Sequence, residues 1–327
     1  MSVALATTSN SLSVFEAASP PAASIRDLFF LILFITAVIF LLTEGLIVYC
    51  IWRFRRKPET SPAEPPQIYG SNPIEVAWTI GPALVVFVLF LVMVRTVAAV
   101  RVREQPADAL HVTVIGHQWW WEYEYYETSP SGEKRLLFRT ANELHVPQNR
   151  AVALELKSAD VIHSFWVPRL AGKVDVVPGH TNHLWFQVWE PGVYHGQCAE
   201  YCGDQHANMM LRVVVDPPGE FDAWLKNEQQ PARDAPDVRV GRQLFASLAC
   251  VECHTIRGTR AEGRFGPDLT HLMGRQTLIA TTTPNNRDTL HRWVRNPHDL
   301  KPGAKMPSFQ LSEGQLREMA AYLESLR

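Results

Sequence analysis

Two long apolar runs lie near the start of the chain, and the pattern of apolar and polar positions changes twice after them. The runs cover Leu28–Trp52 and Val76–Val100. Each has 25 residues, so as a helix it is about 37 Å long and can cross a membrane with some tilt. Isolated charges, Glu44 and Arg95, stand toward one end of each run. We therefore expect a two-helix transmembrane hairpin.

From Leu110 onward, apolar and polar positions alternate in short runs rich in β-branched and aromatic residues. Turn signals separate these runs at 130–132, 178–179 and 191–192. About 115 residues of this kind predict an antiparallel sandwich or barrel. The expected strands lie in His111–Tyr126, Arg135–Thr140, Ala151–Leu156, Asn182–Trp189 and Asn208–Val215.

The C-terminal part has helical spacing and follows a proline-rich stretch. Its expected helices are Arg239–Ala249, Arg287–Arg295 and Ser312–Leu326. The chain thus divides into five segments. They are a flexible tail (1–27), a transmembrane hairpin (28–100), an all-β domain (101–215), a linker (216–237) with a short helical piece, and an all-α domain (238–327).

Basic residues indicate the orientation of the hairpin. Arg53, Arg55, Arg56 and Lys57 directly follow the first span. Loops rich in Lys and Arg stay in the cytoplasm, so this loop is expected there and both chain termini on the outer side. Three bases near the end of the second span oppose this assignment: Arg95, Arg101 and Arg103.

Charge is distributed unevenly along the chain. The net charge of −2 argues against a nucleic-acid scaffold, and 46% hydrophobic residues exclude a disordered protein. Residues 100–235 carry net −6, and residues 236–327 carry net +4. We expect the two external domains to dock electrostatically; the alternatives are that these charges face water or that the basic face serves an external acidic donor. The exposed charges expected to take part are Arg257, Arg264, Lys301 and Lys305 with Glu122, Glu124 and Asp204.

The first cysteine pair lies in a loop between two expected strands, with Cys198, Cys202, His206 and Met209 within twelve residues. Thiolate, thioether and imidazole ligands together favour copper. Two thiolates can bridge two copper ions, each of which then needs a terminal imidazole. His163, at the end of an expected strand, is the best second imidazole. A disulfide or a structural zinc site remains possible, although zinc has no use for Met209.

The second pair, Cys250-Val-Glu-Cys253-His254, has the C-x-x-C-H spacing of covalent haem c attachment. The cysteines form thioethers, and His254 becomes an axial ligand of the iron. Met306 is the preferred opposite ligand, and Met273 is its rival. A thioredoxin-like pair would need a βαβ context, whereas this region has helical spacing. A zinc site would need a second cysteine pair here.

The first motif, C-x-E-x-C-x3-H-x2-M, resembles subunit II of the haem–copper cytochrome c oxidases, and the resemblance covers residues 28–215. It implies a cupredoxin-like domain holding the dinuclear copper centre CuA. The implied ligands are His163, Cys198, Cys202, His206, Met209 and the backbone carbonyl of Glu200. The Glu200 side chain would reach a magnesium ion shared with the catalytic subunit. In the second region, Gly266-Pro-Asp-Leu269 resembles the haem-packing loop of class I cytochromes c.

The resemblance also bears on three further positions. Gly116–Trp121 is similar to the aromatic region near CuA, which implies that Trp119 leads electrons to the copper; core packing is the alternative. Glu75, at the start of the second span, would stand at the mouth of a proton path, or else serve as a favourable charge at a helix N-terminus. His180 departs from the family, which more often has Arg after Pro-Gly.

Together these features predict the electron-entry subunit of an aerobic, proton-translocating cytochrome c oxidase, with a C-terminally fused cytochrome c domain. Electrons would pass from an external donor, cytochrome c or similar, to haem c, then CuA, then the oxygen-reducing subunit I. The location would be a bacterial inner membrane, with both termini periplasmic. Alternatives are a CuA-containing subunit of a nitric oxide reductase and a membrane-anchored carrier without a catalytic partner. Quinol oxidase subunits lack these copper ligands and are excluded.

Overall fold

A computed structural model describes residues 12–55, 67–101, 106, 108–129, 133–233 and 235–327. Residues 23–101 form one compact unit, and the rest of the chain forms a second. The predicted turn at 130–132 and the loop bases Arg56 and Lys57 lie outside the described residues, as does Arg103.

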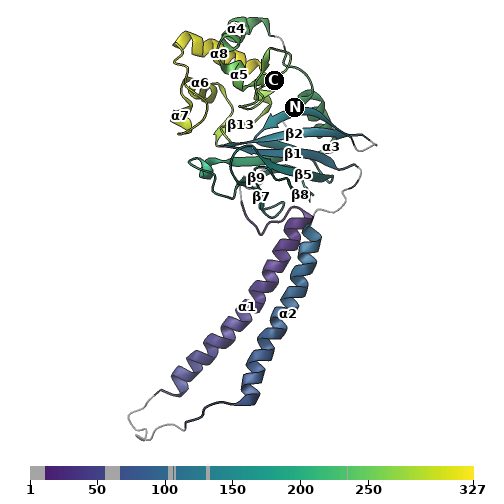
Figure 1. The fold of residues 1–327 in the computed structure, drawn as a ribbon, viewed down its shortest axis with the longest axis vertical. Coiled ribbons are helices and arrows are strands. Elements are labelled where there is room, and N and C mark those ends of the chain that lie inside the picture. Colours follow the sequence, from purple (N-terminus) through teal and green to yellow (C-terminus); the bar gives the residue numbers. More distant parts are fainter. Residues whose placement is uncertain (1–11, 56–66, 102–105, 107, 130–132, 234) are drawn as a thin grey trace. The chain divides into compact units, whose positions relative to one another are not determined.

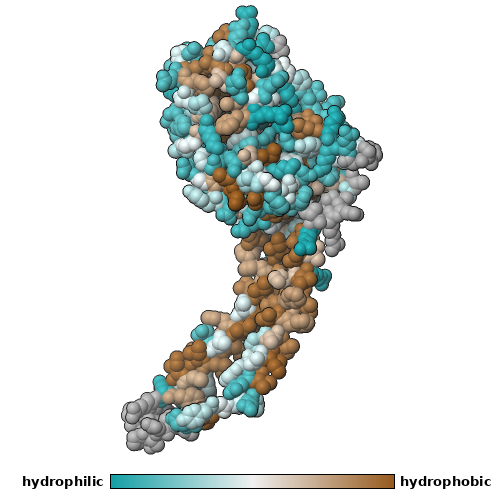
Figure 2. All heavy atoms as spheres, viewed as in Figure 1, coloured by the Kyte–Doolittle hydropathy of each residue, from teal (hydrophilic) through white to brown (hydrophobic). Residues whose placement is uncertain are grey.

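The first unit is dominated by two apolar helices, α1 (Pro20–Arg53) and α2 (Asn72–Val100). Both are long and apolar enough to cross a membrane, and their most apolar stretches are entirely unburied. Apolar side chains cover them on the face shown in Figure 2. Helix α1 begins earlier than expected, since consecutive prolines suit a first helical turn. Residues 20–27 are therefore helical instead of belonging to a flexible tail.

The second unit contains a sandwich of two five-stranded sheets, here called the β-sandwich domain (Figure 1). One sheet has the order β3-β2-β1-β5-β8 and the other β4-β10-β9-β6-β7. The strands are β1 (Leu110–His117), β2 (Trp120–Thr128), β3 (Lys134–Ala141), β4 (Glu143–Pro147), β5 (Ala151–Ser158), β6 (His163–Trp166), β7 (Val174–Val176), β8 (Asn182–Gln187), β9 (Gly192–Cys198) and β10 (Met210–Asp216).

The long run expected at 111–126 is a hairpin rather than one strand. Strands β1 and β2 pair antiparallel, with His117 opposite Trp120, and Gln118 and Trp119 form the turn. Successive side chains of a strand point to opposite faces of the sheet. The side chains on the inner face, among them Val114 and Trp121, are buried in the core. This hairpin brings the tryptophan segment to the end of the sandwich where β6 begins.

The expected linker contains helix α3 (Pro218–Glu228), which is packed on the sandwich. Phe221 is fully buried, and the Trp224 ring contacts Tyr125, Phe138 and His145 at centroid distances of 5.3, 5.6 and 4.3 Å. Residues beyond α3 are hydrogen bonded to the next domain, since Ala232 N donates to Arg257 O. Much of the segment is therefore ordered structure.

Residues 236–327 form the C-terminal domain, which has its own hydrophobic cluster. Its helices are η2 (Pro236–Val238), α4 (Arg239–Ser247), α5 (Cys250–Cys253), η3 (Leu272–Gly274), α6 (Arg287–Arg295), α7 (Pro297–Leu300) and α8 (Glu313–Ser325). Two short ladders, β11 (Thr255–Ile256) with β12 (Ala261–Glu262) and β13 (Thr277–Leu278) with β14 (Thr283–Pro284), complete it. The three helices expected from the sequence are present.

Candidate metal and haem centres

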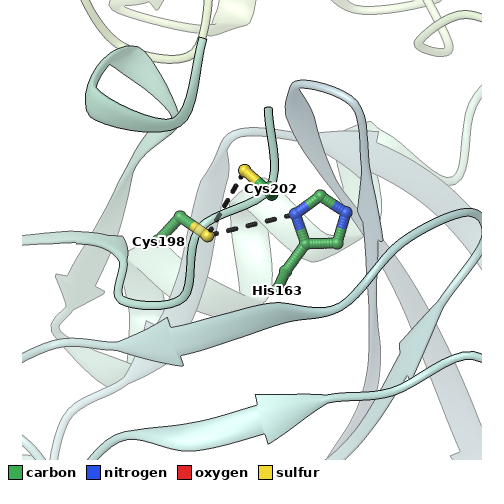
Figure 3. A group of neighbouring side chains, drawn as sticks. All are labelled: His163, Cys198 and Cys202. Carbon is green, nitrogen blue, oxygen red and sulfur yellow. Dashed lines mark hydrogen bonds between the residues drawn. The ribbon is translucent and has the colours of Figure 1, made fainter. Parts of the chain in front are cut away.

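Two thiols and an imidazole converge at the end of the β-sandwich domain. His163 begins β6, Cys198 ends β9, and Cys202 lies in the following loop (Figure 3). Their ligand atoms all lie within 4.8 Å of one another, and all three residues are buried. The Cys198 Sγ atom is 3.8 Å from Cys202 Sγ and 3.9 Å from His163 Nδ1. The two cysteines are free thiols, not a disulfide.

The loop between β9 and β10 supplies the remaining predicted ligands. His206 Nδ1 lies 3.7 Å from Cys202 Sγ, and Met209 Sδ lies 3.8 Å from the same sulfur. The carbonyl oxygen of Glu200 is 3.2 Å from Cys198 Sγ. Each thiol thus has one imidazole beside it, with a thioether and a carbonyl at the edges. This donor set fits two copper ions bridged by thiolates.

Asp160 orients the His163 ring, a role that the sequence analysis did not assign. His163 Nε2 donates to Asp160 Oδ1 at 2.8 Å, which leaves Nδ1 facing the thiols. Burial opposes ionisation of Asp160, but the hydrogen bonds from His163, Gln118 N and Val161 N together outweigh it and lower the pKa of Asp160 to about 2. Gly116 allows the ring to come close, since a Cβ there would lie 2.8 Å from His163 Cδ2. The only sequence signal was an acid three residues before the histidine.

The two cysteines affect each other's ionisation. The hydrogen bond from the Cys202 thiol, helped by His163, lowers the pKa of Cys198 well below its ordinary value. The same contact raises the pKa of Cys202 far above its ordinary value, since a second negative charge beside the first is disfavoured. Copper ligation requires both thiols deprotonated, so metal binding would release a proton here.

The three tryptophans have different environments. Trp119 Nε1 donates to the Cys202 carbonyl at 2.9 Å, so this ring contacts the ligand loop directly. Trp121 is fully buried, with its ring 5.5 Å from that of Phe165. Trp120 stacks on His117 at 4.2 Å. Both Trp119 and Trp121 belong to the hydrophobic core, Trp121 from strand β2 and Trp119 from the β1–β2 turn.

A second site is a cavity of about 460 Å³ lined by Cys250, Cys253, His254 and Met306. His254 Nδ1 donates to the Pro267 carbonyl at 2.8 Å, which leaves Nε2 as the ligand nitrogen. A Cβ at Gly266 would lie 2.6 Å from His254 Cε1, so the Gly-Pro pair holds the ring from one side. Burial lowers the pKa of His254 and favours the neutral imidazole that metal ligation requires.

The lining of the same cavity favours Met306 over Met273, and the assignment of Met306 as haem ligand stays a prediction. Met306 and Met319 line it, whereas Met273 packs against the hydrophobic cluster of the C-terminal domain. Arg275 also lines the cavity, and its buried Nε has no partner among the residues that the structure describes. The size of the cavity, its two thiols, its imidazole and this free donor fit a haem with acidic substituents.

Glu75 lies in the first turn of α2. Its Oε1 accepts from the Ser71 backbone N at 3.3 Å, and the residue is exposed. This contact satisfies one of the free N–H groups at the beginning of the helix. A helix-terminal role is thus visible in this chain, and the proton-path role stays a prediction.

Comparisons with known proteins agree with this geometry. Family models match for the periplasmic domain of cytochrome c oxidase subunit II at residues 110–216, its transmembrane domain at 7–95 and cytochrome c at 238–327. Cytochrome c oxidase subunit 2 of Alkalihalophilus pseudofirmus is 31% identical over 97% of this chain and 91% of its own. The subunit 2 of a Bacillus species is 32% identical over 84% and 80%.

A solved periplasmic domain of the oxidase subunit II of Bradyrhizobium japonicum is 32% identical, with a TM-score of 0.32; it covers 38% of this chain and 96% of its own. The relative from Alkalihalophilus pseudofirmus spans nearly the whole of this sequence, including the C-terminal domain. The chain therefore belongs to the cytochrome c oxidase subunit II family, in a form that carries a C-terminal cytochrome c domain.

Proposed function

We infer that this chain is the electron-entry subunit of a cytochrome c oxidase. The observation that carries this conclusion is the pairing of each thiol with its own imidazole, Cys198 with His163 and Cys202 with His206. A dinuclear thiolate-bridged centre needs this arrangement, and family membership implies copper there and haem in the C-terminal domain. No residue cluster for oxygen chemistry was identified in the sequence, so oxygen reduction is assigned to another subunit, subunit I.

The residues divide the work as follows. His163, Cys198, Cys202, His206, Met209 and the Glu200 carbonyl would hold copper; Cys250, Cys253, His254 and Met306 would hold haem c. When bound, copper and haem each supply one-electron redox chemistry. This chemistry needs neither proton transfer nor a pocket for a substrate. The protein contributes rigid ligands: Asp160 and Pro267 fix the two histidine rings, and Trp119 contacts the ligand loop where electrons would enter.

Two finer assignments rest on the resemblance and on exposure. The Glu200 side chain is exposed, while its carbonyl points at Cys198. It is thus free to share a magnesium ion with the catalytic subunit. The apolar helices α1 and α2 anchor the chain in a membrane, and the bases after α1 favour a periplasmic position for both termini. The donor would be a cytochrome c or a similar protein.

The test is purification of the intact complex from membranes, followed by copper, haem and subunit analysis. We expect two coppers and one covalent haem c in this chain, together with a polytopic catalytic subunit. Cys198→Ser and Cys202→Ser should each abolish the mixed-valence electron paramagnetic resonance signal, since both thiolates bridge, and leave haem c attached. An unchanged dinuclear spectrum in either variant would refute the copper assignment.

A further inference from the structure

The β-sandwich domain and the C-terminal domain belong to one compact unit, and charged side chains are buried between them. Glu143, the first residue of β4, is 2% exposed. Its carboxylate contacts the C-terminal domain. It accepts from the backbone N of Gln276 and of Thr277, both at 2.9 Å, and from the Thr277 hydroxyl. Arg212 on β10, which belongs to the same domain as Glu143, places its Nη1 3.4 Å from Glu143 Oε1.

A second buried contact runs in the opposite direction. Lys301, 6% exposed, extends from the C-terminal domain and donates from Nζ to the Trp119 carbonyl. Beside it, Gln205 Nε2 of the copper-ligand loop donates to the Pro302 carbonyl at 2.8 Å. The segment 301–305 directly precedes Met306, the predicted haem ligand. The copper-ligand loop and the haem-ligand loop are therefore joined through hydrogen bonds.

These contacts differ from the electrostatic docking expected from the sequence. Glu122 and Glu124 pair with Arg139 of their own sheet, at 3.3 and 2.7 Å. Arg257 lies with its guanidinium 5.7 Å from the Phe138 ring centroid, in a cation–π contact between the domains. One pair of the expected exposed kind does occur, Lys305 Nζ with Asp160 Oδ2 at 3.8 Å.

We propose that Glu143 and Lys301 form a two-point latch that holds the C-terminal domain on the β-sandwich domain. The two side chains thereby act as positioning residues for electron transfer between the haem and copper centres. A carboxylate with three donors from the other domain fixes both distance and orientation. Buried contacts are screened far less by salt than surface pairs. The proposal rests on the proposed function only for the identity of the two centres, since the contacts themselves need neither copper nor haem chemistry.

The test is amide hydrogen exchange on the full chain in detergent, read on peptides covering residues 275–280. In Glu143→Gln the carboxamide keeps the shape but presents N–H groups to a backbone donor. We expect exchange at Gln276 and Thr277 to accelerate at least about tenfold, equivalent to about 1.4 kcal/mol. Glu124→Gln is the matched control, because it removes a carboxylate paired with Arg139 inside one domain. Its peptides at 275–280 should match those of the wild type.

Thr277→Val distinguishes loss of the latch from misfolding of the β-sandwich domain. It removes only the Thr277 hydroxyl, a donor that belongs to the C-terminal domain. It should give an intermediate acceleration, with β5 peptides and both cofactor spectra unchanged. In Glu143→Gln, transfer between haem c and copper should become multiphasic at unchanged midpoint potentials, and Lys301→Met should likewise give multiphasic transfer. Unchanged exchange in Glu143→Gln, or wild-type amides at 275–280 that exchange as fast as free loops, would overturn the latch and leave the copper assignment intact.

Discussion

Two histidines show how single residues prepare the centres. His163 donates from Nε2 to Asp160 and presents Nδ1 to the thiols, whereas His254 donates from Nδ1 to Pro267 and presents Nε2 to the cavity. In each case the outer hydrogen bond selects the tautomer and the ring angle. Short-range contacts therefore orient the two histidines predicted to ligate copper and haem.

Met306 should control the haem potential. Met306→Ala removes the cavity-lining thioether, so haem stays covalently bound through Cys250 and Cys253 while its sixth position opens. Carbon monoxide should then bind readily, and the potential should fall by on the order of 0.1 V within the ~0.8 V range that axial ligands cover. Redox titration and carbon monoxide difference spectra measure this. Met273→Ala is the control, and the reverse result would assign the ligand to Met273.

Lys301 should make stability depend on pH. Burial lowers its pKa from 10.5 to about 8, because the charged ammonium loses hydration. Between these values the unfolded chain binds more protons than the native chain, so the free energy of unfolding rises with pH in this window. Lys301→Met should flatten that rise. Thermal unfolding followed at the haem band between about pH 7 and 10.5 tests it; the exposed Lys305→Met should retain the wild-type slope.

At the scale of elements, the copper ligands come from two places that the fold brings together. Strand β6 supplies His163, the end of β9 supplies Cys198, and the following loop supplies the others, while Trp119 of the β1–β2 turn donates to this loop. Strands β6 and β9 pair directly, with Phe165 opposite Cys198. The pairing of two strands distant in sequence thus sets the spacing between the separate imidazole and the thiols.

Glu75 at the beginning of α2 allows its two roles to be separated. Glu75→Gln keeps an acceptor for the Ser71 N–H but cannot carry a proton, whereas Glu75→Ala loses both. A proton path predicts that both variants slow steady-state turnover several-fold, with transfer from haem c to copper unchanged. A purely helix-terminal role predicts that only Ala has an effect, a stability loss of about 0.3–1 kcal/mol. Oxygen consumption and flash kinetics on the purified oxidase distinguish them.

At the scale of the whole molecule, the linker and the latch together join the β-sandwich domain and the C-terminal domain. Helix α3 is packed on the sandwich through Phe221 and Trp224, and His271 donates to the Gln230 carbonyl just beyond it, at 3.0 Å. The net charges of −6 and +4 are therefore accompanied by buried, directional contacts.

Electron transfer from haem c to copper should be nearly independent of ionic strength in the wild type. Between 0.1 and 1 M salt the Debye length falls from ~10 to ~3 Å, which weakens exposed pairs but not buried ones. Flash-induced electron injection into the purified full-length chain measures the rate. A steep slowing with salt, or a split into several phases, would restore electrostatic docking as the controlling interaction.

The sequence alone determined the chemistry and the elements. Local spacing was sufficient for the apolar helices, the C-x-x-C-H motif, the thiol loop and the helices of the C-terminal domain, because each depends on residues close in the chain. Tertiary structure decided which distant groups meet. The contacts of His163 with Cys198 and of Glu143 with Gln276 and Thr277 join segments 35 to 134 residues apart. Charge counting named Lys301 but missed Glu143, because a buried carboxylate and an exposed one look alike in sequence.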